Sequence, residues 1–257
     1  MQVGQEGVFK LHRLIWRGRG LSRTEAGKIV ILEPGVFPGE KVLARISKSR
    51  KDYLQAESLE VLESLPERRV HPCSHFRLCG GCRFGSLPQS RQLELKAQLL
   101  QDELGRAIGA KSDHLAPDLV YRGNPGWRYR WRGQVHVKDK KPHLKRFQSD
   151  ELQPCDDCLL FARPLSRSLP EICKYLPDGR HTIAASPLQY NAVSEHSTQK
   201  ISLPLNDSGL RVDISPATFF QAHQNLNRDL TGYVIDKTRN FGTVADLFAG
   251  AGNFALP

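Results

Sequence analysis

Along the first 66 residues, short apolar runs alternate with polar residues in the two-residue period of half-buried strands. Gly27–Leu32 is rich in residues that favour strands, and two Pro-Gly pairs separate it from a second such segment, Glu40–Ile46. In this second segment every other residue is apolar, namely Val42, Ala44 and Ile46. Short strands joined by turns that contain glycine and proline predict a small OB-type β-barrel over residues 1–66.

Two later segments have the period of amphipathic helices. The first begins near Ser86 and Gln89, which have the spacing of a capping box. Its apolar stripe, which we expect to pack into a core, is Leu93, Ala97, Leu100, Leu104 and Ile108. The second helix is predicted from roughly Asn225 to Lys237, and one of its faces carries Leu226, Leu230 and Val234.

Residues 120–215 are predicted to be mostly β-structure, with short strands bounded by prolines. The last of these strands has Leu210, Val212 and Ile214 at alternate positions. After the second helix, Thr243–Phe248 is a short apolar segment that leads into the glycine turn Ala249–Phe254. We expect this segment to be the first strand of a parallel sheet, followed by a turn over which a cofactor approaches the backbone.

Composition places the 257-residue chain among ordinary globular proteins, with 39% apolar and 25% charged residues. No apolar run is long enough to span a bilayer, and the first residues lack the pattern of a signal peptide. We therefore expect a cytoplasmic protein, in which the six cysteines are metal ligands or packed thiols rather than disulfides.

Positive charge is concentrated in the first part of the chain. Residues 1–150 contain 28 lysines and arginines against 16 acidic residues, whereas residues 151–257 contain 9 against 11. The positive electrostatic field of such a surface attracts a polyanionic partner. An alternative explanation is that the charge serves only to keep the protein soluble.

Three cysteines form a C-x5-C-x2-C run, Cys73, Cys79 and Cys82, with two glycines inside the closer pair. Two intervening residues let both sulfurs face one metal, so this run predicts a metal site. Thiolates suit zinc and iron–sulfur clusters alike, and the spacing does not choose between them. A fourth ligand is expected from Cys155 or Cys158, whereas Cys173 is expected to be a packed thiol.

Between Tyr121 and Arg146 nine basic residues are opposed by one aspartate, and three aromatic residues alternate with three of the arginines. On a regular strand, Trp127, Tyr129 and Trp131 would share one face and Arg128, Arg130 and Arg132 the other. The arginines are candidate RNA-phosphate contacts. The aromatic residues fit either a stacking surface for unpaired bases or a packed core.

In order along the whole chain, these segments resemble the RNA uracil-5-methyltransferases, specifically the RlmD (RumA) type that acts on large-subunit ribosomal RNA. Residues 1–66 resemble the TRAM barrel of that family, notably in Gly35–Glu40, and the cysteine run resembles its [4Fe–4S] motif. Ser215-Pro216 with Phe219-Phe220-Gln221 resembles the segment that opens its methyltransferase domain. Because the transfer-RNA branch is taken to lack both barrel and cysteine motif, the resemblance implies a ribosomal substrate.

The resemblance implies a multidomain chain of three parts. These are a TRAM-like OB barrel at 1–66, a central mostly-β iron–sulfur and RNA-binding domain at 67–84 and 117–212, and the beginning of a class I α/β methyltransferase domain at 85–116 and 213–257. The implied cluster ligands are Cys73, Cys79, Cys82 and Cys158, because Cys158 precedes an apolar run as the fourth ligand of the family does. The implied contacts of S-adenosylmethionine are Gln221, Phe248, Gly250, Gly252 and Asn253. His223 and Ala249 replace the asparagine and cysteine that are common in the family.

In the family, the cysteine nucleophile and the general base lie beyond the glycine turn, whereas every cysteine here precedes Gly250. We therefore expect a C-terminally truncated methyltransferase with no catalytic residue, only part of the cofactor site, and no activity by itself. The alternatives are a non-catalytic RNA-binding metalloprotein and an unrelated zinc-ribbon protein. The expected partner is large-subunit ribosomal RNA, with no membrane association and a monomeric chain.

Overall fold

The structure, a computed structural model, describes residues 1–76, 78–109, 126–189, 191–206 and 209–257. The chain divides into two compact units: unit 1 is Met1–Arg77 with Gly81–Val120, and unit 2 is Leu78–Gly80 with Tyr121–Pro257. Arg122, a member of the predicted basic stretch, lies outside the described residues. Among the helices that are described, none has both the length and the apolar character needed to cross a membrane.

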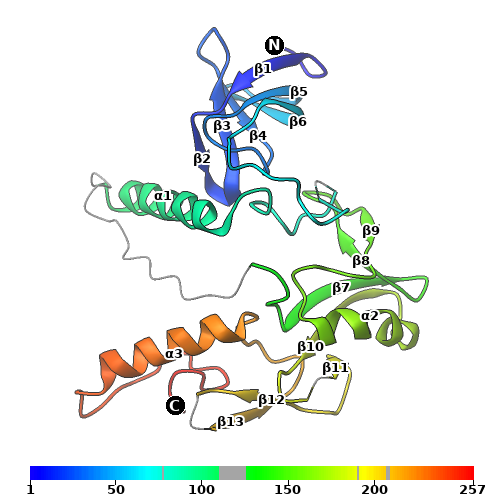
Figure 1. Cartoon of the computed structure of the whole chain (residues 1–257), viewed down its shortest axis with the longest axis vertical. Coiled ribbons are helices and arrows are strands. Elements are labelled where there is room, and N and C mark those ends of the chain that lie inside the picture. Colours follow the sequence, from blue (N-terminus) through cyan, green and yellow to red (C-terminus); the bar gives the residue numbers. More distant parts are fainter. Residues whose placement is uncertain (77, 110–125, 190, 207–208) are drawn as a thin grey trace. The chain divides into compact units, whose positions relative to one another are not determined.

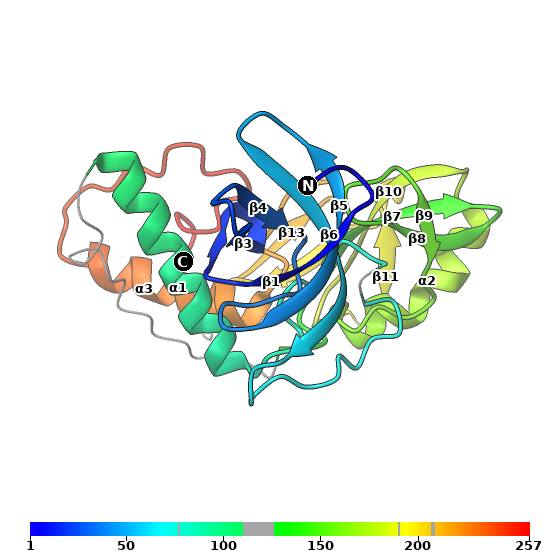
Figure 2. The same ribbon diagram turned by 90° about the horizontal axis from the view of Figure 1, so that it is seen from above.

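The described part of unit 1 is a curled sheet of six strands with one helix (Figure 1). In chain order its elements are β1 Glu6–Lys10, β2 Arg13–Ile15, the 3₁₀ turn η1 Trp16–Gly18, β3 Arg19–Arg23, β4 Ile29–Leu32, β5 Lys41–Ser49, β6 Tyr53–Glu63 and α1 Gln89–Ile108. The strand order is β1-β5-β6-β4-β3-β2, and only β4 and β6 pair in parallel. Figure 2 shows the long β5 and β6 side by side, and three register shifts interrupt their ladder. Such irregularities bend a strand and increase its twist.

The two strands predicted in this region are confirmed as β4 and β5. Val42, Ala44 and Ile46 are completely buried, as their alternation predicts, and together with residues of the neighbouring strands they form the core of the sheet. The assignment of this curled sheet to the OB or TRAM type stays a prediction.

The segment Gly35–Glu40 forms a tight loop that precedes β5. Gly35 and Gly39 have φ values of +104° and +95°, a backbone region that residues with a Cβ rarely adopt. The loop folds around the carboxylate of Glu40, which is fully buried and accepts a hydrogen bond from the backbone N–H of Phe37 at 2.9 Å. Arg68 forms the ion pair that neutralises it, with Nε 2.6 Å from Oε1 and Nη2 2.8 Å from Oε2.

Helix α1 differs from its prediction in its start and in its buried face. Pro88 occupies the N-cap position and Ser86 forms no capping hydrogen bond, so the predicted capping box is wrong. Leu95 packs in a small core with Leu14, Phe37 and Leu87. Three members of the predicted core stripe are exposed, namely Leu100, Leu104 and Ile108. The physical reason is that the helix contacts the sheet through a face offset from this stripe.

Unit 2 is also mostly β-structure in its described part, with two helices (Figure 1). Its elements are β7 Arg132–Lys138, β8 Lys141–Lys145, β9 Leu152–Pro154, α2 Arg163–Tyr175, β10 Gly179–Ala185, β11 Ala192–Ser194, β12 Ile201–Pro204, β13 Arg211–Ile214 and α3 Gln224–Thr238. An antiparallel sheet has the order β11-β10-β7-β8-β9, and β12 pairs with β13 in a separate ribbon. The mostly-β prediction is confirmed, but it missed α2.

Strand β10 is buried on both faces. Ile183 and Ala185 pack with Leu165 and Leu169 of α2, whereas Ala184, which points to the opposite face, packs in the cluster that contains the β12–β13 ribbon. Helix α3 confirms the second predicted helix and places Leu226 and Leu230 on an exposed face. Its buried residues are polar, namely Gln224, Asn227 and Thr231.

The predicted strand Thr243–Phe248 is wrong. These residues form no ladder with any other described segment, and a strand exists only through such pairing. Val244, Leu247 and Phe248 are exposed.

Candidate functional site

The predicted basic and aromatic strand at 127–132 is interrupted in unit 2. Arg128 has a left-handed backbone with φ of +59°, and β7 begins only at Arg132. Around this break the chain pairs with two different neighbours, because Arg130 forms isolated bridges with Phe161 and His223. The expectation that three arginines line one face of a regular strand is therefore wrong.

Arg128 is occupied by an ion pair within unit 2. Its two terminal nitrogens lie 2.5 and 2.7 Å from the carboxylate oxygens of Asp157, and Nη1 also donates to the carbonyl of Cys158 at 3.1 Å. This hydrogen bonding lowers the pKa of Asp157 to about 2 and raises the pKa of Arg128. Arg128 therefore fixes the loop that carries Cys158.

Arg132 also contacts groups of its own unit. Its Nη2 lies 3.5 Å from the carbonyl oxygen of Ala217, and its guanidinium carbon lies 5.8 Å from the centre of the Phe219 ring. Its Nε is buried and has no hydrogen-bond partner among the described residues. Burial is the main cause that lowers the pKa of Arg132.

A cavity of about 210 Å³ lies beside the interrupted segment. The rings of Tyr129 and His223 stack at its wall, with centres 4.7 Å apart and planes inclined by 22°. His223 also caps α3, because its Nδ1 accepts the backbone N–H of Leu226 at 3.2 Å. The residues that line the cavity are Arg128, Tyr129, Trp131, Pro187, Pro204, Asn206, His223, Gln224, Asn225 and Arg228. It therefore combines aromatic surface, hydrogen-bonding groups and positive charge.

The cysteines of the predicted metal site are divided between the units. Cys73 and Cys82 belong to unit 1, whereas Cys79, Cys155 and Cys158 belong to unit 2. Cys79 bridges to Arg146, and next to it the backbone of Gly80 passes close to that of Phe147. A Cβ on Gly80 would lie 3.4 Å from the Cα of Phe147, which is van der Waals contact distance. The cluster itself stays a prediction.

Cys158 has the surroundings of a thiolate. A hydrogen bond from Cys155 is the main cause that lowers its pKa to about 6, and the backbone N–H groups of Leu160 and Phe161 add to the effect. Cys173, by contrast, is completely buried in α2, and burial raises its pKa to about 11. The prediction of a packed thiol at Cys173 is confirmed.

The predicted cofactor residues all lie in unit 2, and four of them belong to the segment 248–253 that contains the glycine turn. Asn253 and Asn227 of α3 exchange two amide hydrogen bonds, at 2.8 and 3.0 Å. Gly250 and Gly252 have φ values of +57° and +77°. Phe248 is fully exposed. Gln221 is also exposed, and its carbonyl oxygen accepts a hydrogen bond from Gln224 at 2.9 Å.

Sequence reasoning missed one cluster of potential ligands. Within the described residues a single group of three His, Cys, Asp or Glu side chains brings its ligand atoms within 4.8 Å of one another: His181, Glu195 and His196. The two histidines are fifteen residues apart, and only the pairing of β10 with β11 makes them neighbours. No spacing motif in the sequence signals such a pair.

No protein-family model matches the chain. Curated relatives do match it over its whole length, and they are named 23S rRNA (uracil(1939)-C(5))-methyltransferase RlmD. That of Pseudomonas entomophila is 27% identical over 99% of this chain and 66% of its own length. That of Shewanella amazonensis is 25% identical over 100% of this chain and 68% of its own. The chain thus spans about two thirds of the length of the relatives that it matches.

A solved structure shares the fold. It is the Pyrococcus abyssi tRNA (uracil-54, C5)-methyltransferase in complex with S-adenosyl-L-homocysteine, with a TM-score of 0.64 and 16% identity. The match covers 96% of this chain and 69% of that one. A transfer-RNA enzyme therefore shares the fold of nearly the whole chain, including its N-terminal unit. The fold by itself therefore does not separate the transfer-RNA branch from the ribosomal one.

Proposed function

We propose that this chain, which is related over its whole length to the RlmD-type RNA uracil-C5-methyltransferases, is the RNA-binding portion of an enzyme that methylates uracil C5 in ribosomal RNA with S-adenosylmethionine. The observation that carries the proposal is the match of 99–100% of the chain to these methyltransferases. The printed sequence has no cysteine after Cys173, so we assign no catalytic role to any residue in it.

The cavity beside Tyr129 is the proposed contact with an unpaired nucleotide. Its volume of about 210 Å³ is below the roughly 300–1,000 Å³ typical of pockets for drug-sized ligands, which favours a single base over a larger ligand. Tyr129, His223 and Trp131 offer ring faces for stacking. Arg228 of α3 supplies positive charge for a neighbouring phosphate.

The proposed RNA contacts still include Arg128, Arg130 and Arg132. They are not equally suitable for mutation, because some of them also stabilise the fold. Arg128 and Arg132 have the internal partners described above, so their removal would disturb the fold together with any RNA contact. Arg130 and Arg228 are the better choices, because Arg228 lines the cavity and its hydrogen bond to Asn225, at 3.3 Å, lies within one turn of the same helix.

Binding of a single-stranded, uridine-containing RNA to the full chain, measured against salt concentration, tests this proposal. Arg130→Gln and Arg228→Gln should each reduce the log–log salt slope by about 0.7, the contribution of one phosphate on a single strand. Tyr129→Leu should instead weaken binding by about 1–3 kcal/mol with an unchanged slope, because it removes stacking without removing charge.

Arg239→Gln is the matched control, because Arg239 ends the same helix, has its own ion pair with Asp236, and does not line the cavity. Wild-type affinity and slope in both Arg228→Gln and Tyr129→Leu would exclude this cavity as the RNA site.

We also propose a [4Fe–4S] cluster held by Cys73, Cys79, Cys82 and Cys158. The proposal rests on the cysteine spacing and on the resemblance of that run to the family motif, and four thiolates are a suitable donor set for such a cluster. Anaerobically purified protein should contain about four irons per chain. Cys158→Ser should lose them, whereas the neighbouring Cys155→Ser should retain them. Protein that contains zinc and no iron would refute this ligand set. So would loss of the iron in Cys155→Ser together with its retention in Cys158→Ser.

S-adenosylmethionine is the proposed methyl donor, with contacts at Gln221, Phe248, Gly250, Gly252 and Asn253. One oxygen of Asp246, just before the turn, is buried without a hydrogen-bond partner among the described residues, and a donor from a ligand would satisfy it. Calorimetric titration of the chain with S-adenosylmethionine tests these contacts. If Asn253→Ala left the affinity for S-adenosylmethionine unchanged, Asn253 would not be one of its contacts.

A further inference from the structure

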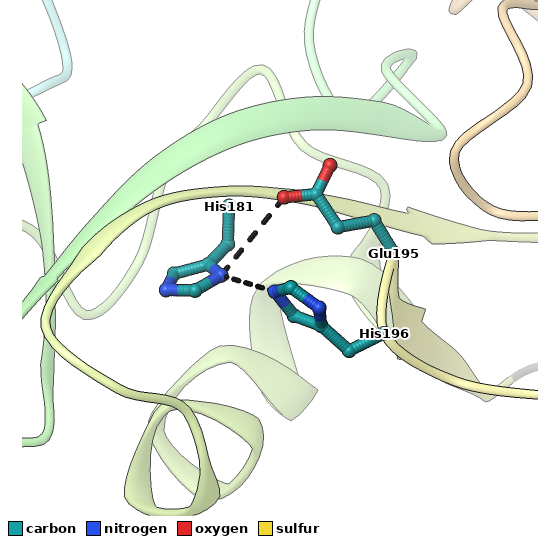
Figure 3. A group of neighbouring side chains, drawn as sticks. All are labelled: His181, Glu195 and His196. Carbon is teal, nitrogen blue, oxygen red and sulfur yellow. Dashed lines mark hydrogen bonds and ion pairs between the residues drawn. The ribbon is translucent and has the colours of Figure 1, made fainter.

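The cluster His181, Glu195 and His196 lies in unit 2 at one end of the β10–β11 ladder. Ile183 pairs with Ser194, and the backbone N–H of Glu195 donates to the carbonyl of Thr182 at 2.9 Å, which continues the ladder by one residue. His181 and His196 therefore stand opposite each other, one residue further along. Figure 3 shows Nδ1 of His181 directed toward a ring nitrogen of His196, with the carboxylate of Glu195 beside them, and the two ring planes are inclined by 69°.

Hydrogen bonding determines which nitrogen of His181 is available to a ligand. Its Nε2 lies 2.7 Å from the carbonyl oxygen of Pro177, which can only accept, so Nε2 carries a hydrogen. In the neutral ring Nδ1 then has a free electron pair, and it points toward the other two side chains. Nδ1 is 3.1 Å from Nε2 of His196 and 3.9 Å from Oε1 of Glu195.

We propose that Nδ1 of His181, Nε2 of His196 and Oε1 of Glu195 bind a divalent transition-metal ion of the zinc class. Two imidazoles and one carboxylate are a common ligand set for zinc. Two nitrogens bound to one tetrahedral zinc at about 2.0–2.1 Å lie about 3.3 Å apart, which is close to the 3.1 Å between Nδ1 of His181 and Nε2 of His196. The carboxylate oxygen reaches the same point after a small movement of the half-buried Glu195 side chain.

The groups around the three ligands hold them as the outer partners of metal sites do. A metal-binding histidine typically donates its other ring N–H to a backbone carbonyl or a carboxylate, which is what His181 does with Pro177. The backbone of Glu195 is held against β10, because its N–H donates to the carbonyl of Thr182 at 2.9 Å. His181 is 4% exposed whereas His196 is exposed, so the site has a fixed inner ligand and an opening to solvent.

The alternative to a metal site is a direct hydrogen bond between the two imidazole rings. Zinc titration of the full chain distinguishes these two interpretations. Wild-type protein should bind one zinc ion at this site. His196→Ala should lower the affinity for that ion by more than about tenfold, since even outer partners of metal sites contribute about 10–100-fold to metal affinity. Glu195→Gln should weaken it in the same direction. His12→Ala, which removes an exposed histidine of unit 1, is the control and should leave zinc binding unchanged.

Cobalt substitution distinguishes this site from zinc held by the cysteines. Cobalt bound by nitrogen and oxygen should give visible d–d bands without thiolate charge-transfer absorption, and His196→Ala should abolish those bands. Zinc should also raise the melting temperature of wild-type protein and not that of His196→Ala, because a ligand stabilises the state that binds it. Equal zinc affinity of the wild type and His196→Ala, or a cobalt spectrum of thiolate type only, would overturn the proposal. These readouts require neither RNA nor S-adenosylmethionine.

Discussion

The ion pair between Glu40 and Arg68 should be one of the largest single contributions to the stability of unit 1, and replacing Arg68 tests this. The carboxylate of Glu40 has no exposed surface, and the side chain of Arg68 is 15% exposed. Arg68→Met would leave a buried carboxylate with only the backbone N–H groups of Phe37 and Leu65, at 2.9 and 3.4 Å. Removing one partner of a buried pair typically costs about 3–5 kcal/mol.

The structure adds two smaller losses to this cost. Arg68 also donates to the carbonyl of Gly35 at 2.7 Å, and its guanidinium lies 5.2 Å from the centre of the Phe37 ring. These contacts fix the loop that precedes β5. Arg68→Met should therefore lower the free energy of unfolding of unit 1 by about 3–5 kcal/mol, a large fraction of the 5–15 kcal/mol that stabilises a typical protein.

Hydrogen exchange of β5 and β6 amides in the full chain measures this loss without interference from unit 2. The control is Lys41→Ala, which breaks the exposed ion pair with Glu63 and should cost less than about 1 kcal/mol. The double variant with Glu40→Gln should be less destabilised than the sum of the two single variants, because it leaves no buried charge. If Arg68→Met cost no more than Lys41→Ala, or the double variant were strictly additive, the reasoning would fail.

Three further outcomes follow from the packing of unit 2. Gly133→Ala should destabilise the protein by about 1–3 kcal/mol in urea unfolding, because its Cβ would come within 2.5 Å of Cζ of the buried Phe161. Gly232→Ala on α3, where no atom lies within 4 Å, should instead stabilise the protein by about 0.5–1 kcal/mol in the same assay. Burial raises the pKa of Cys173 to about 11, so the fold favours the neutral thiol over the thiolate. The contribution of this thiol to stability is therefore complete below pH 9 and is lost as the pH rises toward 11. Cys173→Ala should therefore flatten the fall in melting temperature between these pH values.

The strands of unit 1 were predictable because their alternation matches the two faces of a sheet. Val42, Ala44 and Ile46 can be buried together only if β5 is extended, and the turns that flank it are marked by Gly35 and Gly39. The role of Glu40 was not predictable, because its partner Arg68 is distant in the sequence and follows two further strands.

The segment 127–132 shows where periodicity misleads. Alternating aromatic and basic residues predict a regular strand, but the pattern carries no information about Asp157, whose pairing with Arg128 accompanies a left-handed backbone. The cluster of His181 and His196 was missed for a related reason. Its members become neighbours only through strand register, which depends on the whole sheet.

The two helices α1 and α3 show a different limit of sequence reasoning. An apolar stripe indicates that a helix face favours burial, but it does not identify the surface that covers it. Within the described residues Leu100 and Leu104 of α1, like Leu226 and Leu230 of α3, remain exposed. Apolar surface of this kind favours contact with another protein surface, because covering it removes its contact with water. Both helices were therefore predictable as helices, whereas their packing depends on neighbours that their own sequences do not specify.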